Sequence, residues 1–369
     1  MAGSDNILGR FEMSAPTIDF GLQFFPDVGP DEKSAQAYWN ESLTLVGLAD
    51  ELGYGHIRTV EHYCNRYGGY STNPIVFLSA ASQRSSRARL ITGALLPVFN
   101  NPLKMAGEIG MLDAISNGRM EAGFARAFLP HEFRTFGRSL DESIARFDEG
   151  IEQVRRLLEE EDITLTGIFH SFENVTSLPR PTQIPRPPFW YATTSSPQSF
   201  EKAGRLGHKI MTIPRSAPQL RELFGIYRDA WRAADHPGNG TIMMTIAMYC
   251  AGNSKEATDT YREPVNRHQR YLADAASDWA AGTTSKDYPN HPKMLEALRK
   301  MDHDAMRPLN MVWTGSPTEI INMITTLHND VGGFDVASLM SNAWTLPADK
   351  AAASMRLISE QIMPHFKAR

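Results

Sequence analysis

A histidine between a carboxylate and a phenol follows a short apolar run of the chain. Glu61, His62 and Tyr63 come directly after His56-Ile-Arg-Thr-Val60, which has the character of a strand. At the carboxyl end of a barrel strand, such residues line the mouth where catalytic groups gather. His62 could exchange protons near neutral pH, and Glu61 could fix its tautomer or anchor the strand end. The alternative is a loop histidine that is satisfied by its surroundings.

Two later segments have the chemistry of an anion site. Arg126 ends the run Glu121-Ala-Gly-Phe-Ala-Arg126, and its planar guanidinium suits a phosphate or a carboxylate. The run Thr193-Thr194-Ser195-Ser196 precedes a helix starting near Pro197, where hydroxyl and backbone N–H groups can converge on a phosphate. A surface ion pair is an equally good interpretation of Arg126, and helix capping accounts for one hydroxyl but not four.

Short apolar runs alternate with amphipathic helical segments from about Thr17 onwards. The runs that we expect to be strands are residues 18–25, 56–60, 89–95, 120–124, 189–192, 209–213, 241–251 and 334–339. Proline at the first helical position opens several helices between them, as in Asn73-Pro74 and Asn101-Pro102. This alternation predicts an α/β fold of the TIM-type (β/α)8 barrel class rather than an open doubly wound sheet.

The domain organisation follows from the same pattern. We expect a flexible N-terminal tail at residues 1–16 and a single barrel domain at residues 17–369, with insertions at about 164–188 and 274–307. Long excursions from a compact domain are often lids or binding loops. Surface decoration is the alternative, and for the second insertion the two interpretations are evenly matched.

Composition excludes several classes of protein. The net charge of −5 gives no electrostatic reason to expect nucleic acid or an anionic membrane as partner. Cys64 and Cys250 lie far apart, which argues against a disulfide framework or a zinc site and fits the cytoplasm. The chain shows no H-E-x-x-H, G-x-S-x-G or Walker pattern, so we expect no metal site, and hydrolase and P-loop interpretations lose their usual support.

Several motifs, in order, resemble those of the bacterial luciferase family. They are Glu61-His62-Tyr63, Asn73-Pro74, Leu112-Asp-Ala-Ile-Ser-Asn-Gly-Arg119, Arg126 and Phe133-Arg-Thr-Phe-Gly137. The match in order and spacing extends over roughly Phe20 to Ile213. The resemblance implies a luciferase-like barrel enzyme, an oxidoreductase that uses reduced FMN and O2 to insert one oxygen atom into an organic substrate through a flavin C4a-peroxide.

The resemblance also implies roles for particular residues. His62 matches the active-site histidine that assists formation and breakdown of the flavin peroxide. Arg126 and the run Thr194, Ser195, Ser196 match the FMN phosphate site. The turn at Gly93, Ala94 and Leu95 matches a place where the family often has a non-proline cis peptide against the flavin ring.

Departures from the family pattern limit what can be carried over. Tyr63 replaces the second histidine of the family's pair, and Ala125 replaces the luciferase cysteine near the flavin, so light emission is not implied. Glu61 favours FMN, because users of the deazaflavin F420 usually carry aspartate there. An F420-dependent oxidoreductase and a non-catalytic flavin-binding protein remain alternatives, although a protein that only binds flavin would not need His62.

The resemblance extends to partners. A separate NAD(P)H-dependent reductase would supply the reduced FMN, and we expect a homodimer. The substrate would be a hydrophobic molecule of moderate size, undergoing hydroxylation, epoxidation or Baeyer–Villiger oxidation. Five aromatic residues are candidates for lining the predicted mouth: Phe24, Phe99, Phe128, Trp190 and Trp313.

Overall fold

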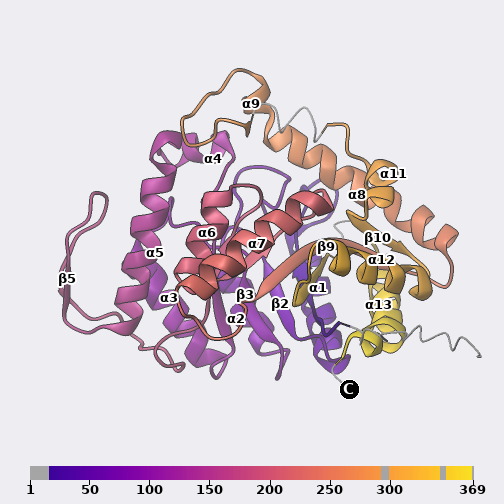
Figure 1. Cartoon of the computed structure of the whole chain (residues 1–369), viewed down its shortest axis with the longest axis horizontal. Helices are drawn as coiled ribbons and strands as arrows, with labels where there is room; N and C mark the ends of the chain where they lie inside the picture. The colour runs from indigo at the N-terminus through magenta and orange to yellow at the C-terminus, as the bar shows by residue number, and fades with distance from the viewer. Residues whose placement is uncertain (1–15, 292–298, 341–345, 368–369) are drawn as a thin grey trace, which may run out of the picture.

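A closed parallel barrel forms the centre of the computed structural model, which describes residues 16–291, 299–340 and 346–367 (Figure 1). In spatial order its eight strands are β1 (Asp19–Phe24), β2 (His56–Thr59), β3 (Arg89–Thr92), β4 (Met120–Phe124), β7 (Phe189–Ala192), β8 (Lys209–Thr212), β9 (Ile242–Cys250) and β11 (Val336–Met340). Each neighbouring pair is parallel, and β11 pairs with β1 to close the ring. The predicted TIM-type barrel, with all eight of its strands, is confirmed.

Helices surround the barrel and begin where the sequence provides caps (Figure 1). They are α1 (Ala35–Glu51), α2 (Pro74–Ser82), α3 (Pro102–Ile115), α5 (Ser143–Glu159), α6 (Pro197–Arg205), α7 (Ala217–Ala233), α8 (Ser254–Ala275), α12 (Pro317–Asp330) and α13 (Ala348–Leu357). Asn73 and Asn101 cap α2 and α3 by accepting from the N–H groups of Ile75 and Leu103, both at 2.9 Å. Each cap precedes a proline, which has no N–H to leave unsatisfied.

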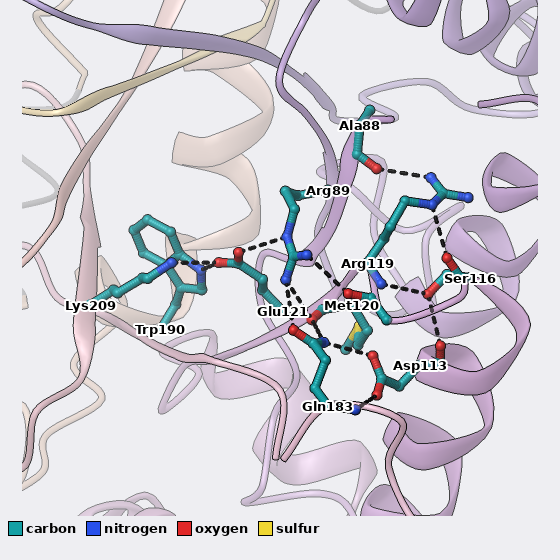
Figure 2. A network of polar contacts seen from close by, with 11 residues as sticks. Ala88, Arg89, Asp113, Ser116, Arg119, Met120, Glu121, Gln183, Trp190 and Lys209 are labelled. Atoms are coloured by element: carbon teal, nitrogen blue, oxygen red, sulfur yellow. Dashed lines mark hydrogen bonds and ion pairs between the residues drawn. The ribbon is translucent and has the colours of Figure 1, made fainter. Parts of the chain in front are cut away.

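The barrel interior is apolar at mid-height and charged towards the amino ends of the strands. Ile91, Trp190, Met211, Met243 and Val336 fill the middle. Below them, the carboxylate of Glu121 accepts from Arg89 Nε at 2.9 Å, Trp190 Nε1 at 2.5 Å and Lys209 Nζ at 3.1 Å (Figure 2). Polar groups at this end of a barrel stabilise the fold rather than take part in chemistry.

The same network explains one of the motifs. Arg119 donates to the carbonyl oxygens of Ala88 and Ser116, both at 2.9 Å, and so fastens the end of α3 to the start of β3 (Figure 2). It also donates to the carbonyl oxygen of Ser82 at 2.9 Å. Beside it, Gln183 bridges Arg89 and Asp113. The segment at 112–119, which resembles a family motif, therefore stabilises the barrel at the amino ends of its strands.

The first insertion lies on the outside of the molecule. It holds a hairpin of β5 (Ile163–Leu165) and β6 (Phe172–Val175) that the sequence did not predict, drawn beside α5 in Figure 1. The carboxylate of Glu149 on α5 accepts from the N–H groups of Ile168 at 2.6 Å and His170 at 2.8 Å, which clamps the turn. Surface decoration is the better interpretation of this insertion.

The second insertion packs over the top of the barrel. It contains α9 (Ser277–Ala280) and α11 (His303–Met306), and residues 292–298 within it lie outside the described residues. Trp279 Nε1 donates to the carbonyl of Phe128 at 3.0 Å, and the Tyr288 hydroxyl donates to the carbonyl of Ala127 at 2.8 Å. Because both acceptors lie in the loop after β4, the lid interpretation is favoured here.

The tail expected at 1–16 lies, apart from Pro16, outside the described residues. A ninth strand, β10 (Val312–Gly315), pairs with β9 outside the ring. None of the helices within the described ranges has both the length and the apolar character needed to cross a bilayer.

Candidate active site

His62 lies just beyond the end of β2 and forms a pair with a buried carboxylate from the short helix that follows β4. Its Nδ1 is 3.0 Å from Oε1 of Glu132, whose side chain is completely buried, while His62 itself is 12% exposed. Glu132 belongs to α4 (Pro130–Thr135), which follows β4. Its Oε1 also accepts the backbone N–H of Tyr63 at 2.9 Å. An ionised Glu132 therefore favours the tautomer with the proton on Nδ1, which leaves Nε2 for exchange with a substrate or cofactor.

Two substitutions of Glu132 distinguish its two effects on His62, which are to position the imidazole and to place a negative charge beside it. Glu132→Gln removes only the charge, whereas Glu132→Ala removes both. We expect the alanine variant to lower turnover by about 10- to 100-fold, since outer-shell partners of functional histidines typically carry effects of this size. The glutamine variant should lose less, because its amide oxygen can still accept from both N–H groups. Steady-state rates of both variants test this, and equal losses in both would show that charge alone matters.

Of the two roles considered for Glu61, the structure supports the anchoring of the strand end. It does not serve as the partner of His62 Nδ1, a position that Glu132 occupies. Instead its carboxylate accepts from the Leu96 N–H at 3.1 Å, the Asn100 side-chain amide at 2.9 Å and the Tyr63 hydroxyl at 2.6 Å. Glu61 thus ties the end of β2 to the loop after β3. Burial raises the pKa of Glu61 from 4.5 to about 7.

This pKa predicts a pH-dependent contribution to stability. A carboxyl group with a higher pKa in the folded chain stabilises the fold below pH 4.5, and this contribution is lost as the pH rises through about 7. Between about pH 5 and pH 8, the free energy of unfolding should fall by about 2 kcal/mol more in the native chain than in Glu61→Gln. Urea denaturation of both proteins at the two pH values measures the difference. Parallel pH profiles would contradict the assigned pKa.

The turn after β3 has the backbone feature that the resemblance implies. The peptide between Gly93 and Ala94 is cis. Ala94 and Leu95 are buried, and the Leu95 N–H donates to the Gly123 carbonyl at 2.7 Å. A Cβ on Gly93 would lie 1.8 Å from Nε of Arg58, so only glycine fits at this position.

The two parts of the predicted phosphate site follow neighbouring strands. Arg126 follows β4, and Thr194 and Ser195 follow β7, which pairs with β4; both hydroxyl residues are exposed. Ser196 is the N-cap of α6, but its side chain does not cap the helix and instead contacts Gln198. The alternative of helix capping by Ser196 is therefore not what the structure shows.

No acid in the described part of the chain neutralises the charge of Arg126. Its guanidinium lies 4.3 Å from the centre of the Tyr288 ring, and within the described ranges it forms no ion pair. The surface ion pair considered from the sequence is thus absent there. A phosphate-bearing cofactor fits this set of one cation and exposed donors at a helix start.

A second histidine–carboxylate pair was missed in the sequence. Asp27, fully buried after β1, accepts the Gly68 N–H at 3.0 Å and contacts Nδ1 of His268 on α8. Burial raises the pKa of Asp27. The Phe25 ring packs against both histidines, 5.8 Å from His62 and 5.1 Å from His268. Two such pairs therefore border one aromatic side chain at the mouth.

Only two of the five aromatic candidates lie at the mouth. Phe99 and Phe128 are partly buried there, and Phe128 is 6.4 Å from the His62 ring. The other three belong to the core, which corrects the prediction. Phe24 faces the helices and packs on α2, Trp190 fills the barrel, and Trp313 is buried in β10. Alternation along a strand sends such side chains inward or outward in ways that composition does not reveal.

Comparison with known proteins shows the family to which the chain belongs. The family model for luciferase-like monooxygenases matches residues 18–332. The oxygenase component of a flavin-dependent trigonelline monooxygenase from Acinetobacter baylyi is 26% identical, with 91% of this chain and 92% of that protein covered. The crystal structure of the monooxygenase RslO1 from Streptomyces bottropensis is 42% identical, with a TM-score of 0.85, covering 95% of this chain and all of that one.

A more distant structure shares the fold alone. It is the oxygenating constituent of 3,6-diketocamphane monooxygenase of Pseudomonas putida, a type II Baeyer–Villiger monooxygenase in complex with FMN. It is 20% identical, with a TM-score of 0.78 and coverage of 94% of this chain and 98% of that one. Because the family model spans most of the chain, the protein belongs to the luciferase-like monooxygenase family and is a flavin-dependent oxidoreductase.

Proposed function

We propose that this protein uses reduced FMN and O2 to insert one oxygen atom into a hydrophobic organic substrate. The observation that carries the proposal is the His62–Glu132 pair, which stands at the same barrel mouth as Arg126 and the hydroxyl run at Thr194–Ser196. Bound reduced FMN would supply the reaction with O2, which amino-acid side chains cannot perform.

The chain's own residues would bind the cofactor, orient it and handle protons. Arg126 and the hydroxyls of Thr194, Ser195 and Ser196 would hold the phosphate at the start of α6. Nε2 of His62 would give or take a proton at the mouth, with Glu132 holding the ring in place. The lid segment over Ala127 and Phe128 would exclude water from the site.

The aromatic rings at the mouth support the choice of a hydrophobic substrate. Phe25, Tyr67 and Phe128 pack around His62, and Phe99 stacks on Phe136 nearby. Ligand sites are typically apolar with a few polar groups that fix orientation. The product would be a hydroxylated, epoxidised or Baeyer–Villiger-oxidised molecule.

We further propose a separate NAD(P)H-dependent reductase and a second copy of the chain as partners in the cytoplasm. The name of the Acinetobacter relative, an oxygenase component, supports a two-component system. For the homodimer, exposed apolar side chains lie on α2 and α3, where Val76 is 68% and Met111 56% exposed. A contiguous patch of such side chains would favour self-association, and sedimentation analysis at micromolar protein gives the oligomeric state.

Anaerobic titration with reduced FMN and with reduced F420 tests the choice of cofactor. We expect saturable binding of reduced FMN at micromolar concentration and no comparable binding of F420. Binding of F420 alone would instead favour a hydride-transferring enzyme on the same barrel. FMN binding without any oxygenated product in reductase-coupled assays, across a panel of aldehydes, ketones and polycyclic aromatics, would favour a flavin-binding protein without activity.

A further inference from the structure

A guanidinium lies on the axis of the barrel. Arg58 of β2 is only 6% exposed. Nη1 donates to Oε1 of Gln23 on β1 and to Oγ1 of Thr245 on β9, the latter at 2.5 Å. Nη2 donates to the carbonyl of Gly93, just after β3, at 3.2 Å and contacts Sδ of Met211 on β8 at 3.0 Å. Partners from strands on both sides of the ring can meet one side chain only at its centre.

Among the described residues, no acid pairs with the positive charge of Arg58. All four partners are neutral, and within the described residues its Nε has no hydrogen-bond partner. Burial lowers its pKa to about 9, so the group stays protonated at neutral pH. The interior carboxylate of Glu121 forms its ion pairs with Arg89 and Lys209 instead. A buried charge without an opposite charge costs folding free energy, so its presence calls for an anion from outside the chain.

Arg58 also lies directly behind the turn that we assign to the cofactor ring. It donates to the carbonyl of Gly93, the residue on the amino side of the cis peptide to Ala94. Gly93 has no side chain to separate the two, since a Cβ there would collide with Nε of Arg58. The charge of Arg58 would therefore stabilise an anion bound against this turn. That anion is distinct from a phosphate bound by Arg126 at the rim of the barrel.

We propose that Arg58 is a positioning residue whose fixed charge makes the barrel mouth prefer the anionic, reduced form of the FMN ring over the neutral, oxidised form. The inference rests on the proposed function, because it needs FMN to bind at the mouth. Reduced flavin carries its negative charge on the pyrimidine side of the ring at neutral pH, whereas oxidised flavin is neutral there. In the low-dielectric interior of the barrel, this single charge interacts more strongly with the flavin than it would in water.

The test compares dissociation constants for reduced and oxidised FMN, measured anaerobically by absorbance and fluorescence titration. The native chain should bind the reduced form more tightly. Arg58→Met should shrink the ratio of the two constants by at least about tenfold, and Arg58→Lys should keep most of it. Gln23→Glu places a carboxylate against the guanidinium without removing it, and it should shrink the ratio by a similar factor even if Arg58→Met folds poorly.

The outcomes distinguish this inference from the function on which it rests. If the variants weaken both forms of FMN equally, Arg58 only supports the barrel and the inference is wrong. The same conclusion follows if Gln23→Glu keeps the native preference. If the native chain binds FMN in neither form, the proposed function itself fails.

Discussion

The His62→Ala protein is expected to oxygenate its substrate about 100- to 10,000-fold more slowly than the native chain, the range typical for loss of a positioned acid–base group. Its dissociation constant for FMN should change by less than about threefold, since Arg126 and the hydroxyl run carry the phosphate. The physical reason is that Nε2 of His62 is the exchangeable position of a ring held through Nδ1 by buried Glu132. Reductase-coupled product formation and FMN titration measure the two quantities separately.

A neighbouring histidine provides the matched control. His131 bonds only backbone groups in the part of the chain that the structure describes, the carbonyls of Ala275 at 3.2 Å and Tyr63 at 3.1 Å. His131→Asn should therefore retain turnover to within about fivefold, because it removes hydrogen bonds to backbone carbonyls rather than a proton carrier. Near-native turnover by His62→Ala would show that the role given to His62 is wrong.

Arg126→Ala should raise the dissociation constant for FMN by about 10- to 100-fold, the loss expected for hydrogen bonds to a charged group. The guanidinium forms no ion pair within the described residues and rests on Tyr288, so its charge is available to a phosphate. Arg126→Lys should recover part of the affinity through charge alone, without the planar fork. Titration of apoprotein with FMN measures the effect.

Riboflavin binding distinguishes direct contact of Arg126 with the phosphate from an indirect effect of Arg126 on the site. It has the same ring as FMN but no phosphate, so the native chain and Arg126→Ala should bind it equally. An equal loss of affinity for both ligands would mean that Arg126 acts through Tyr288 and the lid instead.

The barrel could be predicted because its signals are local. Buried parallel strands appear as apolar runs, and Asn-Pro pairs mark the helix starts, so the run expected at 241–251 corresponds to β9 at Ile242–Cys250. The missed strands are three or four residues long, as in β5, β6 and β10. Strand formation in such short segments depends on the pairing that the fold supplies, β5 with β6 and β10 with β9, which propensity does not report. Helix α8 contains Pro264, and an internal proline argues against a helix, so the sequence alone does not predict it.

The sequence predicted the candidate site residues that directly follow strands, but not their partners in distant parts of the chain. His62 and Arg126 stand where the barrel rule places functional residues, but Glu132 is 70 residues from His62, and Asp27 is 241 residues from His268. No spacing rule connects such pairs before the loops are placed. Arg58 could have been found, because a cation between Ile57 and Thr59 in a buried strand is out of place unless it has a function.

Isotope incorporation tests the central claim most directly. The native chain, FMN, NAD(P)H and a flavin reductase are incubated with a panel of hydrophobic substrates under oxygen-18 gas, and products are analysed by mass spectrometry. We predict one oxygen-18 atom in the product, dependent on FMN and lost in His62→Ala. Product that carries oxygen from water, or turnover that proceeds without O2, would contradict the account.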